Sequence, residues 1–128
     1  VALGELDRTF GDVYGNDAGH LEFQYTARAS YALNKAFGAP IGKAFGITVG
    51  APAGIGVVLA DTAVKAATVD VIGYASPAGG TSFSNEVISF LSGDSGAVRQ
   101  AIIAAREVGI PLLGALGAKP ESTTTPYI

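Results

Sequence analysis

Alternating apolar and polar residues mark the first regular element of the chain, at residues 20–28. Leu21, Phe23 and Tyr25 fall on one face of an extended segment, with polar residues between them. A period of two residues is typical of a strand with one buried and one wet face. Residues 29–37 follow with good helix formers and are closed by a glycine and a proline, so the sequence predicts a short helix there.

The rest of the pattern predicts two longer helices and four further strands. In chain order these are a strand at 43–50, a helix at 55–68, strands at 69–75 and 85–92, a helix at 95–108 and a short strand at 112–116. Asp94 or Ser95 is the expected N-cap of the second long helix, Gly109 its expected end and Pro111 the stop signal after it. This order predicts a layered α/β domain in which helices pack on a small sheet.

The two ends of the chain lack such a pattern. Residues 1–19 carry four spaced glycines and are expected to form an arm or linker. Residues 118–128 are polar with two prolines and are expected to be a mobile or partner-docked tail. The length of 128 residues suits one domain, at 20–117.

The composition indicates that part of the surface is not exposed to solvent. Hydrophobic residues make up 48% of the chain and charged residues only 15%, against roughly 25% charged in an average soluble domain. Burial against neighbouring subunits explains this shortage of charge. A membrane span does not, because the longest weakly charged stretch, 45–60, is interrupted by five Gly or Pro residues and is shorter than the roughly 20 residues that a spanning helix needs.

Charge and reactive residues exclude several function classes. The net charge is −3 with no cluster of Lys or Arg, which argues against a nucleic-acid partner. There is no cysteine, and His20 is the only histidine, so neither a thiolate nor a metal site is expected. No signal peptide is visible, which makes the cytoplasm the expected location. The chain begins at Val1 and has no Met, so we expect a processed chain or a piece of a longer one.

Two short motifs suggest enzymes, and each has a simpler structural explanation. Residues 93–96, Gly-Asp-Ser-Gly, match the surroundings of a serine protease nucleophile, yet capping of the following helix explains them better. Residues 50–56 resemble a dinucleotide-binding turn between strand and helix. The glycine spacing is wrong and Pro52 removes a backbone donor, so close packing of helix on strand is favoured. A nucleotide- or phosphate-binding enzyme domain at 50–56 stays an alternative.

Three stretches between Lys43 and Gly117 resemble the shell domain of bacterial microcompartments. They are Ala-Asp-Thr-Ala-Val-Lys-Ala-Ala at 60–67, Val-Asp-Val-Ile-Gly-Tyr at 69–74 and Gly-Asp-Ser-Gly-Ala-Val at 93–98. The resemblance implies a ferredoxin-like α+β fold with a small mixed or antiparallel sheet. Because a strand–helix unit comes first, the chain resembles the circularly permuted form of the domain. Its sequence is similar to the C-terminal half of the tandem shell proteins of propanediol- and ethanol-utilisation compartments.

The resemblance also implies a function without catalytic residues, cofactor or metal. Such a protein self-assembles, with other shell proteins and with the N-terminal half of the tandem chain, into trimeric, pseudohexameric tiles with pores for small polar metabolites such as a diol or glycerol. Lys65 matches the family's tile-edge lysine, although it can also be the solvated partner of Asp61. The implied pore loop consists of Ser76, Pro77, Ala78, Gly79, Gly80, Thr81, Ser82, Phe83 and Ser84. A small regulatory ligand-binding module remains a further alternative.

Overall fold

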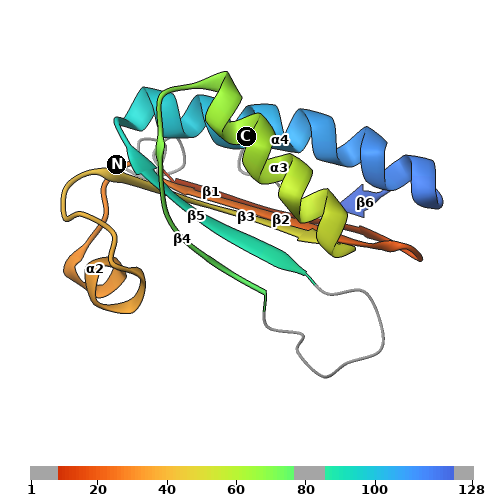
Figure 1. Cartoon of the computed structure of the whole chain (residues 1–128), viewed down its shortest axis with the longest axis horizontal. Coiled ribbons are helices and arrows are strands. Elements are labelled where there is room, and N and C mark those ends of the chain that lie inside the picture. Colours follow the sequence, from red (N-terminus) through yellow and green to blue (C-terminus); the bar gives the residue numbers. More distant parts are fainter. Residues whose placement is uncertain (1–8, 77–85, 123–128) are drawn as a thin grey trace.

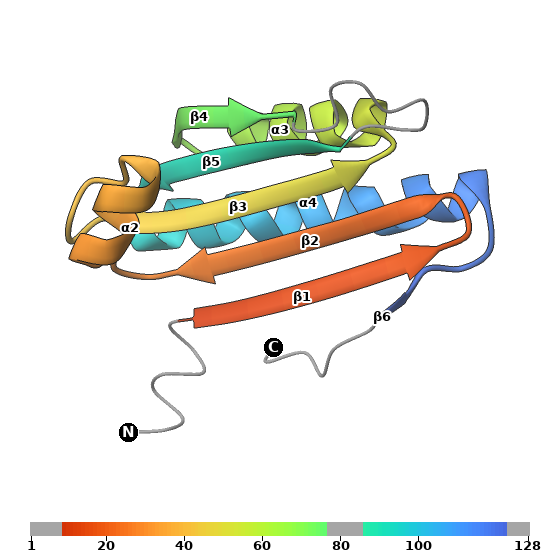
Figure 2. The ribbon, with the colours of Figure 1, turned by 90° about the horizontal axis from the view of Figure 1, so that it is seen from below.

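A single antiparallel sheet with helices on both faces organises the chain. The computed structural model describes residues 9–76 and 86–122. Its elements are β1 (Thr9–Asn16), β2 (Gly19–Thr26), α2 (Tyr31–Phe37), β3 (Ala44–Ala51), α3 (Ala53–Ala66), β4 (Asp70–Ala75), β5 (Val87–Gly93), α4 (Ser95–Leu116) and β6 (Glu121–Ser122). The strand order is β4-β5-β3-β2-β1-β6, and every neighbouring pair is antiparallel. The helices α3 and α4 cover one face, while α2 lies on the other face near one end (Figures 1 and 2).

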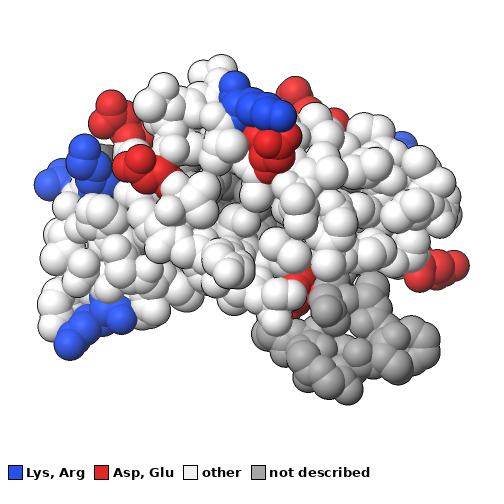
Figure 3. All heavy atoms as spheres, viewed as in Figure 1, with Lys and Arg blue, Asp and Glu red and all other residues white. Residues whose placement is uncertain are grey.

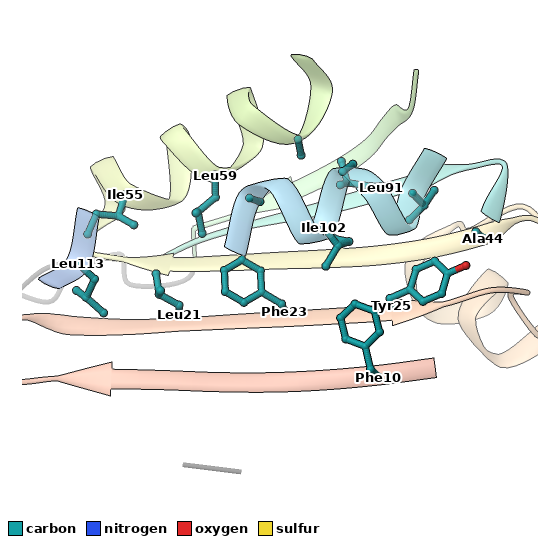
Figure 4. Packing of buried hydrophobic residues seen from close by; sticks show 14 residues of the cluster. Phe10, Leu21, Phe23, Tyr25, Ala44, Ile55, Leu59, Leu91, Ile102 and Leu113 are labelled. Carbon is teal, nitrogen blue, oxygen red and sulfur yellow. The ribbon is translucent and has the colours of Figure 1, made fainter. Parts of the chain in front are cut away.

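The main core lies between the sheet and the pair α3–α4, as the alternation in β2 predicts. Leu21, Phe23 and Tyr25 are buried on this side, whereas the polar residues between them are exposed. Leu59 of α3 and Ile102 of α4 are fully buried against the same layer (Figure 4). The predicted strands at 20–28, 43–50, 69–75 and 85–92 and the predicted helices at 29–37 and 55–68 are all present, with ends shifted by a few residues.

The short helix α2 is attached to the opposite face of the sheet by aromatic rings. It ends where Gly38 adopts a left-handed conformation with φ 72°, as the glycine in the sequence predicts. The ring of Phe37 lies 5.4 Å from that of Phe45 and 5.1 Å from that of Phe90, measured between centroids. This second cluster covers only one end of the face, so the rest of that face has no helix on it among the described residues.

The prediction of an arm or linker at 1–19 is wrong for residues 9–16, which form β1 and pair with β2 along their whole length. The cause is Asp12, a charged residue at a core-facing position, which interrupts the apolar alternation of Phe10 and Tyr14. Its side chain is 0% exposed, and its Oδ2 accepts a hydrogen bond of 2.6 Å from Arg106 of α4. Burial, helped by the Asp12 carboxylate, raises the pKa of Tyr14 above its ordinary value of 10.0.

The end of the second long helix also differs from its prediction. The helix α4 runs to Leu116 through Gly109 and Pro111, so the predicted helix end at 108 and the strand at 112–116 are wrong. Gly109 is a packing residue, because a Cβ there would lie 2.7 Å from Leu59 Cδ2. Leu113, one turn further on, is fully buried and extends the same packed face. Pro111 lies on the exposed face, where solvent can satisfy the carbonyl that loses its helical partner.

The polar tail is partly built into the sheet. Residues 121–122 form β6 and pair with β1 of the same chain, so the prediction of a mobile or partner-docked tail is wrong there, and residues 123–128 lie outside the described residues. Asn16 holds the connection, because its Nδ2 donates to the carbonyls of Leu113 at 3.1 Å and Ala118 at 2.7 Å. None of the described helices is both long and apolar enough to cross a membrane.

The contact between α3 and the sheet predicts that two neighbouring glycines respond oppositely to substitution. A Cβ on Gly56 would lie 2.6 Å from Val87 Cβ and 2.9 Å from the Gly50 carbonyl oxygen, whereas one on Gly54 would have nothing within 4 Å. Gly56→Ala should lower the free energy of unfolding by about 1–3 kcal/mol through overpacking. Gly54→Ala, its control, should leave it unchanged or raise it by up to about 1 kcal/mol. Urea unfolding measures both, and equal midpoints would contradict this packing.

The buried pair between β1 and α4 gives a second prediction. Arg106→Leu leaves the Asp12 carboxylate buried without its partner and should destabilise the chain by about 3–5 kcal/mol. Combining it with Asp12→Leu removes the stranded charge and should restore most of that loss. Chemical unfolding of both variants tests this. A double variant no more stable than Arg106→Leu alone would show that the ion pair does not hold β1 in place.

Candidate functional site

The outer flank of the molecule, formed by α3 and the edge strand β4, exposes apolar side chains beside the ion pair of Asp61 and Lys65. We call it the α3–β4 surface; its exposed apolar members are Val57, Val58, Val64, Val71 and Tyr74. Tyr74 is 79% exposed, and apolar side chains grouped on one surface in this way are typical of a contact with another molecule. The space-filling view shows this side of the molecule to be mostly uncharged (Figure 3).

Lys65 lies on this surface near the end of α3. Its Nζ is 2.7 Å from Asp61 Oδ2, with the two side chains 73% and 54% exposed. The i,i+4 pair therefore forms as the spacing predicts, and the lysine is also free to reach a neighbouring molecule. An exposed pair of this kind contributes about 0.2–0.5 kcal/mol to stability, so folding alone does not require it.

The predicted pore loop begins beside the end of β4. Ser76 is described, and its Oγ donates a hydrogen bond of 3.0 Å to the Glu86 carbonyl, so the two ends of the loop are held together. The remaining predicted loop residues lie outside the described residues; they are Pro77, Ala78, Gly79, Gly80, Thr81, Ser82, Phe83 and Ser84.

A cluster of three polar side chains lies at the same end of the sheet. His20 Nε2 is 3.0 Å from Glu86 Oε2 and 3.9 Å from Glu22 Oε2. The strand alternation already places His20 and Glu22 on one face, but the approach of Glu86 depends on the order of β2, β3 and β5 in the sheet. Sequence reasoning therefore missed this cluster, because nothing in the spacing of the chain links residue 86 to residue 20.

The turn at 50–56 is filled by the protein itself. A Cβ on Gly50 would lie 2.5 Å from the Gly56 backbone nitrogen, so the two glycines allow β3 and α3 to touch. Pro52 is the N-cap residue of α3 and offers no backbone N–H there. The geometry favours close packing of helix on strand over a phosphate-binding turn.

The Gly-Asp-Ser-Gly motif at 93–96 is the start of a helix. Asp94 occupies the N-cap position of α4, as predicted, although its side chain makes no capping hydrogen bond. The Ser95 carbonyl accepts a 3.0 Å hydrogen bond from Tyr25 Oη, near the end of β2 opposite to His20. Among the described residues the one imidazole contacts two glutamates and not this serine, so no protease triad is assembled.

A groove of about 550 Å³ lies on the sheet face that α2 leaves open. Its outward-facing lining combines apolar and polar side chains from neighbouring strands: Val13, Glu22, Gln24, Ile47, Val49, Ile88 and Phe90. The groove thus lies on the opposite side of the sheet from the main core, and Glu22 joins it to the His20 cluster.

An antiparallel sheet with both long helices on one face, and an Ala-Asp-x-x-x-Lys sequence in the first of those helices, match the shell-domain features that the sequence resembles. The BMC domain family model matches residues 44–118, more than half of the chain, so the chain belongs to the BMC domain family. It is 68% identical, over all its 128 residues, to the bacterial microcompartment shell protein PduB of Citrobacter freundii, of which it covers 47%. The chain spans about half the length of the curated relatives it matches.

Solved structures agree with this assignment. A crystal structure of a trimeric bacterial microcompartment shell protein PduB superposes with a TM-score of 0.82 at 54% identity, covering 99% of this chain and 56% of that one. The crystal structure of EtuB from Clostridium kluyveri gives 0.76 at 48% identity, covering 96% and 52%. The predicted fold class and family are confirmed by these similarities.

The filled turn at 50–56 predicts how the chain behaves toward nucleotides. Calorimetric titration with nicotinamide or adenine nucleotides should give no saturable heat, because the backbones at Gly50 and Gly56 pack directly against each other and Pro52 offers no N–H to a phosphate. Saturable binding that Gly54→Ala weakens would contradict the packing explanation and support the enzyme alternative.

Proposed function

We propose that this chain is a structural subunit of a bacterial microcompartment shell, of the propanediol- or ethanol-utilisation type, that assembles with copies of itself into trimeric, hexagon-like tiles. The observation that carries the proposal is the similarity over nearly the whole chain to a trimeric shell protein, combined with membership of the BMC domain family. A location in the cytoplasm, within the compartment shell, follows from this role.

The chemistry of the surface supports assembly. Only 15% of residues are charged, and the α3–β4 surface exposes five large apolar side chains next to a free sheet edge. An exposed edge strand with apolar side chains tends to pair with another chain, and a symmetric assembly covers it. The partners we propose are further copies, other shell proteins and the second domain of a tandem chain, since the relatives are about twice as long.

The proposed role involves no catalysis and no cofactor. Support comes from the two enzyme-like motifs, one of which is a packed turn and the other a helix start. Small polar metabolites such as a diol or glycerol are the proposed cargo of a pore lined by residues 76–84. Hydroxyl groups and backbone amides there can both donate to and accept from an alcohol, whereas an aldehyde offers only an acceptor.

Lys65 provides the sharpest test of tile assembly. Lys65→Ala should weaken extended sheets seen by negative-stain electron microscopy, because the exposed ammonium is proposed to cross the contact between neighbouring tiles. The free energy of unfolding should change by less than about 0.5 kcal/mol, since the pair with Asp61 is solvated. Lys35→Ala is the matched control, because Lys35 is an exposed lysine of α2 that forms no ion pair with any residue in 9–76 or 86–122.

The extended layers of assembled protein should persist in the Lys35→Ala control and become smaller or absent in the Lys65→Ala variant. Unchanged sheets in both would remove Lys65 from the tile edge. A protein that stays monomeric at high concentration with native Lys65 would instead favour a small ligand-binding module.

A further inference from the structure

We infer that His20, Glu22 and Glu86 form a binding site for a divalent transition-metal ion of the zinc type, at the end of the sheet where β5 begins. The inference rests on side-chain geometry and does not depend on the proposed shell function. One ligand atom from each of the three residues lies within 4.8 Å of the other two. An imidazole nitrogen with two carboxylate oxygens is a donor set that suits zinc and related ions.

Sheet register explains why three residues from two separated strands meet. His20 lies opposite Ala51 in the β2–β3 pair, and Gly50 lies opposite Val87 in the β3–β5 pair. Continuing that register by one residue places Glu86 on the far side of Ala51. Because Ala51 carries only a methyl group, the longer side chains of His20 and Glu86 can meet over it, and their atoms approach to 3.0 Å.

All three side chains project from the same face of the sheet. Leu21 and Phe23 face the core, so alternation directs His20 and Glu22 to the opposite, open face. The donors therefore converge on one side of the ion position, which leaves the other side to water or a ligand. Their side chains are 41%, 48% and 28% exposed, so an ion can enter from solvent without disturbing the core.

Charge favours a cation at this position. Within residues 9–76 and 86–122, neither glutamate has a Lys or Arg nitrogen within 4.0 Å, and the imidazole of His20 is the basic side chain that contacts both. Two carboxylates held near one imidazole repel each other unless a proton or a metal ion lies between them. The sequence-based expectation of no metal site rested on the single histidine and did not include the two carboxylates that the sheet brings to it.

The position of the site gives it a mechanical consequence. Glu86 is held through its backbone carbonyl by Ser76 and through its carboxylate by His20. An ion shared with Glu22 would therefore fasten the start of β5 and the end of β4 to β2, across the intervening β3. Bound metal should accordingly stabilise the folded chain as well as occupy the site.

Calorimetric titration of the tag-free protein with Zn²⁺ tests the inference, with Mg²⁺ as the hard-cation comparison. We expect one saturable Zn²⁺ per chain and a rise in Tm of several degrees at saturation, with much weaker Mg²⁺ binding because Mg²⁺ prefers oxygen ligands alone. His20→Ala and Glu86→Gln should each weaken Zn²⁺ binding by about 100-fold, since each removes one of three ligands. Glu107→Gln, which removes an exposed carboxylate from α4, is the control and should leave binding unchanged.

The only imidazole of the 128 residues gives an independent readout. Its NMR signals should shift on adding Zn²⁺ at the same stoichiometry as the heat, and Glu22→Gln and Glu86→Gln, which keep side-chain shape, should abolish that shift at low Zn²⁺. Absence of saturable binding, binding that survives His20→Ala, or a Zn²⁺ titration that leaves the imidazole signals in place would each overturn the inference.

Discussion

Close contact between two helices and one face of the sheet determines how the rest of the molecule is arranged. Gly56 lets α3 touch β3 and β5 and has no room for a methyl group, while Gly109 lets α4 pack against Leu59, whose side chain a methyl group there would displace. Because both long helices lie on one side, the other face is covered only near α2 and the edge strand β4 remains open. The open sheet face and the free edge of β4 therefore follow from packing both long helices on one side. Such surfaces suit a protein whose neighbouring subunits cover them.

The sequence predicts most of this fold because apolar periodicity and chain breakers are local signals. The sequence-based prediction is wrong in the regions where tertiary contacts determine the secondary structure. Asp12 interrupts the apolar alternation of β1, so the sequence pattern does not predict this strand. Its buried carboxylate is stabilised by Arg106, which comes 94 residues later in the sequence. Gly109 and Pro111 resemble a helix end, yet the burial of Leu113 carries α4 through them. In each case a contact that is distant in sequence outweighs the local preference.

The functional surfaces divide in the same way. Lys65 and Asp61 are one helical turn apart, so their pairing and exposure follow from spacing alone. The cluster of His20 with Glu86 requires the strand order, because a small residue of β3 must lie between them. The predicted pore loop is represented by Ser76 among the described residues, and the assignment of residues 77–84 to a pore stays a prediction based on family resemblance.

The central claim is that the chain leaves its outer flank open so that copies can cover it. Sedimentation velocity over a wide concentration range, with the chain in its natural sequence context and with negative-stain images of the same samples, tests this claim most directly. The account predicts trimers that give way to flat, regular arrays as concentration rises. A single sedimenting species of monomer mass throughout, with no ordered array in the images, would contradict it.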